Sequence, residues 1–239
     1  MQPAAATLGY DRAITIFSPD GRLFQVQYAG EAVRKGATAL GLKYDRGVIL
    51  ITDKRLVSKL VEPASVEKMF EIDKHICCAS SGLIADARVL VDRGRLEAEI
   101  NRLSYGEPIQ VETLAKRISD LIQTYTQYSG VRPFGIALLI AGVDEAGPRL
   151  FETDPAGALT GYKATVIGSG REIVMGRFEK EYRDGMKKDD AVLLGLRALK
   201  DATDGEISVD SVEIGVVDET RRFKKLPSSE VKAYLDQIG

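Results

Sequence analysis

Residues 9–29 read GYDRAITIFSPDGRLFQVQYA, and this stretch decides the interpretation of the whole chain. It combines a short extended run, a turn at residues 18–21 with a proline and a glycine, and the beginning of an amphipathic helix. Ser18 or Asp20 can cap that helix, because short polar side chains accept hydrogen bonds from free amides at a helix start. Apolar residues then recur at helical spacing, at Leu23, Val26, Ala29 or Gly30, and Val33. We therefore expect a helix over about residues 20–35, with one face that seeks a partner surface.

Composition places the chain among soluble globular proteins. Its 239 residues are 44% hydrophobic and 28% charged, with a formal net charge of −2. The absence of a basic excess argues against nucleic acid as a partner. The longest apolar runs are strand-sized, too short to span a membrane, and the N-terminus lacks the pattern of a secretory signal. These features predict a cytoplasmic protein. Residues 1–9 are Ala-rich without a periodic apolar pattern and are expected to be mobile, and we divide the chain into an N-terminal arm of residues 1–12 and one domain of residues 13–239.

The order of the expected elements favours an α+β layered fold. Strand patterns cover residues 38–43, 48–52, 75–80, 134–143, 149–152, 163–167 and 212–217. Helical patterns cover about residues 83–103, 111–128, 171–183, 189–201 and 228–237. Blocks of strands followed by blocks of helices predict layers rather than alternating βα units.

The residues that most often carry metal or nucleophilic chemistry are scarce. Cys77 and Cys78 are the two cysteines, and as neighbours in a strand they point to opposite faces, poorly placed to bridge each other. His75 is the single histidine, and a hydrogen-bonded structural histidine is the better interpretation. Too few ligands are present for a zinc site, so we expect no metal and no cofactor.

The stretch at residues 9–29 resembles the N-terminal signature of proteasome α-type subunits. The resemblance extends through nearly the whole chain and is closest to archaeal members. Further matching blocks, in the same order, lie at residues 35–41, 81–88, 125–128, 131–135, 154–157 and 167–170. The family implies an α-β-β-α sandwich of two antiparallel sheets, the fold of the N-terminal-nucleophile (Ntn) hydrolases.

The same resemblance implies that this chain is not itself a protease. Catalytic β-type subunits use an N-terminal threonine, whose free amine takes the proton of the attacking hydroxyl. The family register places Ala37 at the nucleophile position, Asp53 at the acid and Met69 at the lysine. An alanine has no attacking oxygen. For Asp53, the alternative is an acid that merely closes a strand, and this is the better interpretation.

In the family, α-type subunits form seven-membered rings whose N-terminal arms close an axial pore. The gate residues implied here are Tyr10, Asp11, Arg12, Pro19 and Tyr28. A tyrosine offers a flat face and a hydroxyl, an aspartate accepts hydrogen bonds, and a proline fixes a turn. The alternatives are packing beneath the helix for Tyr28 and simple solvation for Asp11.

The resemblance also implies that activators dock between neighbouring α subunits, through C-terminal tails that end in a hydrophobic-Tyr-X pattern. Lys68 falls on the lysine that lines these pockets, and an ammonium suits a chain-terminal carboxylate. Gly21, Arg22 and Gly82 are expected around the same pocket. On sequence alone, a solvated surface lysine is the alternative for Lys68.

The loop Tyr128-Ser129-Gly130 resembles the fixed constriction of the pore, although a helix end with glycine is also an ordinary stop. Three residues depart from the family pattern. Gln27 replaces a usual acid, Gly30 a frequent arginine, and Ser129 a usual glycine. Gly30 inside a helix is expected to cost about 1 kcal/mol relative to alanine.

The sequence therefore predicts a non-catalytic α-type subunit of a 20S proteasome. Its expected partners are copies of itself in a heptameric ring, β-type subunits, a regulatory AAA ATPase and unfolded protein substrates, without nucleic acid or membrane. Two alternatives stay open. One is a stand-alone hydrolase whose processing exposes Thr38 or another nucleophile, and the other is a binding module with no protease partner.

Overall fold

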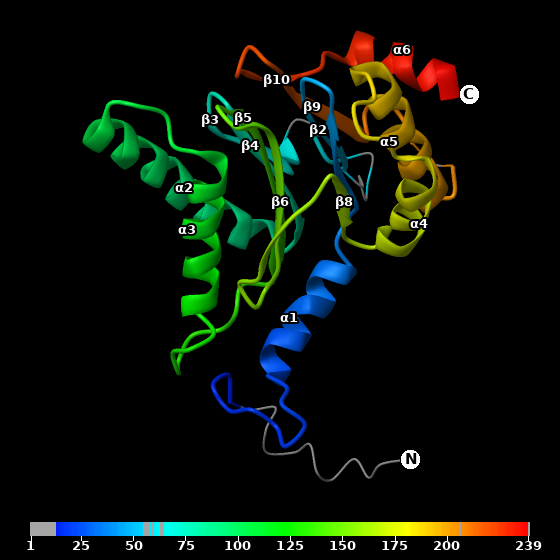
Figure 1. Cartoon of the computed structure of the whole chain (residues 1–239). Helices are drawn as coiled ribbons and strands as arrows, with labels where there is room; N and C mark the ends of the chain where they lie inside the picture. Colours follow the sequence, from blue (N-terminus) through cyan, green and yellow to red (C-terminus); the bar gives the residue numbers. More distant parts are fainter. Residues whose placement is uncertain (1–12, 55–57, 59, 63–64, 206, 239) are drawn as a thin grey trace.

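The computed structural model of the chain describes residues 13–54, 58, 60–62, 65–205 and 207–238. Within these residues it contains six helices and ten strands (Figure 1). The helices are α1 Phe24–Arg34, α2 Ile84–Tyr105, α3 Val111–Thr124, α4 Arg171–Glu181, α5 Lys188–Ala202 and α6 Ser228–Ile238. The strands are β1 Ala39–Tyr44, β2 Gly47–Asp53, β3 Met69–Asp73, β4 Ile76–Gly82, β5 Ile136–Asp144, β6 Gly147–Thr153, β7 Leu159–Gly161, β8 Ala164–Ile167, β9 Val212–Val217 and β10 Phe223–Lys225.

The strands form two antiparallel sheets of five strands each. One sheet has the order β10-β9-β2-β1-β8 and the other the order β3-β4-β5-β6-β7. Short hairpins connect sequential neighbours: Tyr44 pairs with Gly47, so that two residues turn the chain from β1 into β2. The register places Ala39 opposite Thr52 in the first sheet.

Three apolar clusters hold four layers together. One lies between the sheets and includes Leu50, Leu139 and Val217. A second packs α2 and α3 on the β3–β7 sheet, and a third packs α4, α5 and α6 on the other sheet. Figure 1 shows the two helical layers on opposite sides of the paired sheets. This confirms the expected α+β fold, an α-β-β-α sandwich of two antiparallel sheets.

The alternation of side chains along β4 has the expected consequence for its cysteines. Cys77 lies in the cluster between the sheets, whereas Cys78 lies in the cluster beneath α2 and α3. The two thiols therefore face different cores, and both are free. Burial raises the pKa of the Cys78 thiol to about 12 and also raises the pKa of Cys77. Neither thiol is a ready nucleophile at neutral pH.

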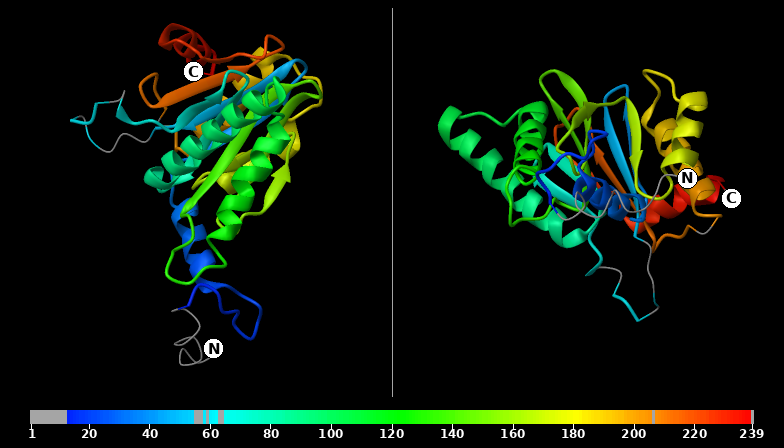
Figure 2. Two further views of the ribbon diagram at one scale, coloured as in Figure 1. Left: turned by 90° about the vertical axis from the view of Figure 1, so that its left-hand side faces the viewer. Right: turned by 90° about the horizontal axis from the view of Figure 1, so that it is seen from below.

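Helix α1 stands apart from the four layers, at one end of the sandwich (Figures 1 and 2). It contacts β4 and β5, and Val33 is its buried residue. The helix begins at Phe24 rather than near residue 20, and the expected capping role of Ser18 or Asp20 is wrong. The Ser18 hydroxyl instead accepts a hydrogen bond from the Arg22 amide at 3.0 Å, so it closes the preceding turn.

Other differences from the expected elements are confined to short strands and one helix end. Strands β3, β7 and β10 were not expected. Helix α3 ends at Thr124, four residues before the predicted end, because the following amides bond to carbonyls only three residues back. The Thr126 amide, for example, donates to the Gln123 carbonyl at 2.9 Å.

Candidate functional site

The nucleophile position implied by the family register lies in the segment between α1 and β1. Ala37 there is 5% exposed, and its side chain is a methyl group. The residues on either side of Ala37 both accept backbone hydrogen bonds. The Ser169 amide donates to the Gly36 carbonyl at 2.9 Å, and the Asp53 amide donates to the Thr38 carbonyl at 2.9 Å. The segment is therefore a buried connection, held by β2 on one side and by the loop before α4 on the other.

The other two positions of that register differ in chemistry. Asp53 ends β2 and is 6% exposed, so a buried carboxyl is present there. Met69 begins β3 and is completely buried in the cluster between the sheets, together with Val33. A thioether has no ammonium to tune a neighbouring amine or hydroxyl. At the positions that the family register implies, Ala37 and Met69 therefore supply neither a hydroxyl nor an ammonium.

Helix α1 lies close to this segment and leads directly into it. The Ser81 hydroxyl donates to the Val33 carbonyl at 3.2 Å, which fixes the end of α1 to the end of β4. A cavity of about 310 Å³ remains beside the helix, and Gln27 and Gly30 line it with Arg34 and Arg171. Two of the three residues expected to depart from the family pattern, Gln27 and Gly30, therefore line the same cavity.

The four residues expected to receive an activator tail form two separate groups within one chain. Lys68 and Gly82 are linked through β4, because the Ser80 amide donates to the Lys68 carbonyl at 3.0 Å. Gly21 and Arg22 lie in the turn before α1, where the Arg22 guanidinium pairs with Asp20 at 2.8 Å. Helix α1 separates the two groups along the chain.

The gate residues are described only in part. Tyr10, Asp11 and Arg12 lie outside the described residues. Pro19 is exposed in the turn before α1. Tyr28 is 51% exposed and stacks on Phe24, with ring centroids 6.3 Å apart. Tyr28 is thus not packed beneath the helix, and its ring is accessible to other residues.

The expected pore loop follows α3 and lies at the same end of the molecule as α1 (Figure 2). Tyr128, Ser129 and Gly130 are all exposed, and Tyr128 is 63% exposed. Gly130 has a φ of +87°, which a glycine adopts readily. These three residues form the tip of a turn that projects away from the sheets.

Asp86, in the first turn of α2, binds the C-terminal end of this loop at Arg132 and Gly135. Its carboxylate accepts hydrogen bonds from both terminal nitrogens of Arg132, at 2.6 and 2.7 Å, and from the Gly135 amide at 2.8 Å. Burial raises the pKa of the Asp86 carboxyl, but these hydrogen bonds and the Arg132 charge outweigh burial and leave the pKa below its ordinary value. Asp86 is therefore a carboxylate at neutral pH.

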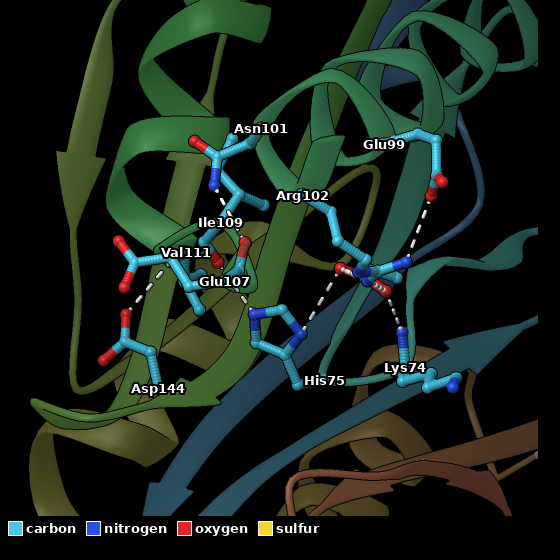
Figure 3. Close-up of polar contacts among 10 residues, drawn as sticks. Lys74, His75, Glu99, Asn101, Arg102, Glu107, Ile109, Val111 and Asp144 are labelled. Atoms are coloured by element: carbon cyan, nitrogen blue, oxygen red, sulfur yellow. Dashed lines mark hydrogen bonds and ion pairs between the residues drawn. The ribbon is translucent and has the colours of Figure 1, made fainter. Parts of the chain in front are cut away.

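His75 belongs to a hydrogen-bonded cluster at the other end of α2 (Figure 3). Its Nε2 lies 2.8 Å from the Ile109 carbonyl oxygen, so this nitrogen donates. Its Nδ1 lies 3.6 Å from Asp73, whose carboxylate accepts two bonds from Arg102 at 2.6 and 2.7 Å. A cavity of about 350 Å³ adjoins the cluster. As expected, His75 is a satisfied structural residue that ties the α2–α3 loop to β4.

The described residues offer neither a metal cluster nor a membrane span. They hold no group of three or more histidine, cysteine or acidic side chains able to bind a metal ion. No described helix is both long enough and apolar enough to cross a membrane.

Comparison with known proteins assigns the chain to a family. The family model described as "Proteasome subunit" matches residues 33–217, and the model for the N-terminal signature of proteasome A-type subunits matches residues 10–32. The chain belongs to the proteasome α-subunit family. It is similar to the proteasome α-subunit of Methanosarcina acetivorans, with 59% identity over 98% of this chain and 95% of the relative.

Two other archaeal α-subunits are similarly related. The protein of Methanoculleus marisnigri is 58% identical over 100% of this chain and 99% of its own length. That of Archaeoglobus fulgidus is 59% identical over 97% of this chain and 94% of its own length. The resemblance seen in the sequence is confirmed over essentially the full α-subunit chain.

Sequence reasoning missed the pair that anchors the loop of this α-subunit. Asp86 and Arg132 each lie in a block that matched the family, at residues 81–88 and 131–135, but 46 positions separate them. Their contact depends on how β4, α2 and β5 are arranged, which no local pattern specifies. A charged residue inside each matching block was the one available signal.

Proposed function

We propose that this chain is a non-catalytic α-type subunit of a 20S proteasome in the cytoplasm. In this role it forms a homo-heptameric outer ring, supports the rings of β-type subunits and lines the route by which unfolded proteins enter. The main support for this proposal is that Ala37 is buried. Its neighbours Gly36 and Thr38 accept backbone hydrogen bonds, and the segment continues directly from α1. A chain that continues through this position offers neither a nucleophilic oxygen nor a free amine.

The second part of the proposal is that the ring controls entry. The N-terminal arm with Tyr10, Asp11 and Arg12, together with Pro19 and Tyr28, closes and braces the gate. The exposed ring of Tyr28 supports this role, since a packed side chain would be inaccessible to the arm. Tyr128, Ser129 and Gly130 line the fixed constriction, in agreement with their exposure at the end of the molecule that carries α1.

The third part concerns the activator. The C-terminal tail of a regulatory AAA ATPase docks between two copies of the chain, with Lys68 pairing to its terminal carboxylate. Gly82 follows Ser81, which bonds to the end of α1, and Lys68 bonds to the neighbouring Ser80, whereas Gly21 and Arg22 precede the beginning of α1. Two groups separated in one chain are compatible with a pocket that neighbouring subunits build together.

The deciding experiment is the native mass of the chain, purified alone and with a β-type subunit from the same organism. The proposal expects a seven-fold ring or its doublet that stacks onto β subunits and gives a particle active on peptides. A monomer that ignores β subunits would contradict it. Intact mass then separates the alternatives: a cut before Ala37 or Thr38 indicates a stand-alone hydrolase, and an uncut monomer indicates a binding module.

A further inference from the structure

Asp86 and Arg132 connect two elements that the proposed function treats separately, the end of β4 near Lys68 and the loop with Tyr128. Asp86 is 5% exposed, and its partner Arg132 extends from the loop with a side chain that is 62% exposed. A bidentate contact between a guanidinium and a carboxylate fixes direction as well as distance. This contact therefore determines how the loop leaves the body of the subunit.

The base of the loop is closed by contacts that leave only its tip free. The rings of Tyr125 and Phe134 lie with centroids 4.6 Å apart, so the two ends of the loop touch. The Thr126 hydroxyl donates to the Gln123 carbonyl at 2.7 Å. All residues from 127 to 132, between these contacts and Phe134, are exposed. Arg132 supplies a side-chain bond from this exposed stretch to the layered core.

The same base is locked to the junction between β4 and α2. The Leu83 amide donates to the Gly135 carbonyl at 2.9 Å. Gly82 has a φ of +118°, and a Cβ there would lie 2.2 Å from the Gly135 carbonyl oxygen. Only glycine permits this approach. Because β4 also carries the Ser80 amide that bonds to Lys68, the loop and the Lys68 region share one rigid support.

We propose that Asp86 and Arg132 are positioning residues that set the pore loop, and thereby the size selectivity of the channel. This inference rests on the proposed function, since it assigns a pore to the loop. Neither residue touches substrate in this account. Their pair holds Tyr128, Ser129 and Gly130 at a fixed reach from the sandwich, and seven copies would give a constriction of fixed width. Loosening the pair would let the tips retreat.

Helix α2 itself supplies a matched control for this proposal. At its other end one terminal nitrogen of Arg102 (Figure 3) donates to both carboxylate oxygens of the buried Asp73, at 2.6 and 2.7 Å. Like Arg132, Arg102 is a partly exposed guanidinium paired with a buried aspartate, but its ion pairs are with Asp73 and Glu99, outside the loop. A general weakening of the fold is expected from either substitution, whereas a change at the pore is expected only from Arg132.

The test uses particles assembled with β-type subunits, in which residues 2–12 are deleted so that the loop rather than the arm limits entry. Turnover of an unfolded protein is compared with that of a short fluorogenic peptide. Arg132→Gln is expected to raise the protein-to-peptide ratio severalfold, and Asp86→Asn to raise it similarly, with no further increase in the double variant. Arg102→Gln is expected to keep the parent ratio.

Each other outcome has a defined meaning. An unchanged or lowered ratio for Arg132→Gln, or an equal rise for Arg102→Gln, overturns the positioning role. If Arg132→Gln does not assemble, Arg132→Lys is measured instead. It must raise the ratio above that of the parent, because it keeps the charge and loses the bidentate geometry, and an unchanged ratio overturns the positioning role. Failure of the parent chain to assemble with β subunits would instead contradict the proposed function itself.

Discussion

The Gly170 amide donates a hydrogen bond of 3.0 Å to the Thr38 hydroxyl, and this bond joins the beginning of α4 to the segment before β1. Thr38 is completely buried. It is the hydroxyl closest in sequence to the nucleophile position, yet it bonds to a backbone amide. This geometry supports a structural role and weighs against the alternative of a hydrolase that uses Thr38.

Replacing Thr38 is therefore expected to cost stability and not catalysis. Thr38→Val keeps the shape of the side chain but leaves the Gly170 amide unpaired, which costs about 1–3 kcal/mol. Chemical denaturation of the purified chain measures this loss, and Thr160→Val at an exposed position is the control. Assembled particles should keep full peptide hydrolysis. Loss of hydrolysis in correctly assembled particles would show that the hydroxyl takes part in chemistry.

Replacing Lys68 is expected to weaken docking of the ATPase without affecting assembly. A hydrogen bond between an ammonium and a carboxylate contributes about 1.5–3 kcal/mol, so Lys68→Ala should raise the ATPase concentration for half-maximal stimulation at least about tenfold. The matched control is Lys74→Ala, an exposed lysine beside His75. Stimulation of the Lys68→Ala particle at the parent concentration would remove Lys68 from the docking site.

Deleting residues 2–12 is expected to open the gate. Peptide hydrolysis by the assembled particle should then rise without any activator, because the arm no longer covers the pore. Electron microscopy or native mass must show that the deletion particle is intact. If intact deletion particles hydrolyse peptides and unfolded protein at the parent rate, the arm is not the gate.

Acid should remove the contribution of Asp86 to stability. Its pKa in the folded chain lies below its ordinary value of 3.8, so the carboxylate stabilises the fold above the unfolded pKa and loses this effect as pH falls through the folded pKa. At neutral pH, Asp86→Asn should cost about 1–2 kcal/mol, a small value because Arg132 is largely exposed. Denaturation of parent and variant from about pH 6 to pH 2 should show the difference shrinking below about pH 4. The exposed Asp236→Asn serves as control, and a difference that persists unchanged at the lowest pH would contradict the assignment.

Gly30→Ala is expected to stabilise the chain. Gly30 lies inside α1, where alanine is favoured by about 0.8–1.0 kcal/mol, and a Cβ there would meet no atom within 4 Å. Gly176 in α4 is equally open and serves as a positive control. Gly94 in α2 is the opposite case, because its Cβ would lie 3.2 Å from Ile118 and Ile72. Thermal unfolding of the Gly30→Ala, Gly176→Ala and Gly94→Ala chains should show higher stability for the first two and lower stability for the third. Destabilisation by Gly30→Ala would mean that the cavity beside α1 is occupied.

The sequence was informative where a pattern was long or a motif was local. The helical pattern over residues 111–128 predicted α3, in which Leu114, Ile118 and Ile122 are completely buried and Leu121 is partly buried. The three-residue strands β7 and β10 were missed because so few residues show no period. Strand β3 was missed although the family register placed Met69 within it at the lysine position.

In the candidate site, too, some features could be predicted from the sequence and others could not. Alanine at position 37 and methionine at position 69 could be read directly, because the absence of an oxygen or an ammonium is a property of the residue type. The beginning of α1 could not be predicted in this way, because the Ser18 hydroxyl accepts a hydrogen bond from the Arg22 amide within its own turn and does not cap the helix. The contact of Asp86 with Arg132 depends on tertiary arrangement, and residue types alone do not predict it.

The packing around Met69 also limits which side chains position 69 can hold. Its sulfur occupies the space beside Gly215, where a Cβ would lie 2.3 Å away, and its neighbours between the sheets are apolar. A lysine in its place would bring an ammonium into that dry interior, at a cost no single residue repays. A threonine at position 37 would still follow a continuous chain through α1. A hydroxyl at position 37 without a free amine would lack its base, and an ammonium at position 69 would lack hydration, so neither substitution alone would supply the chemistry of an N-terminal threonine.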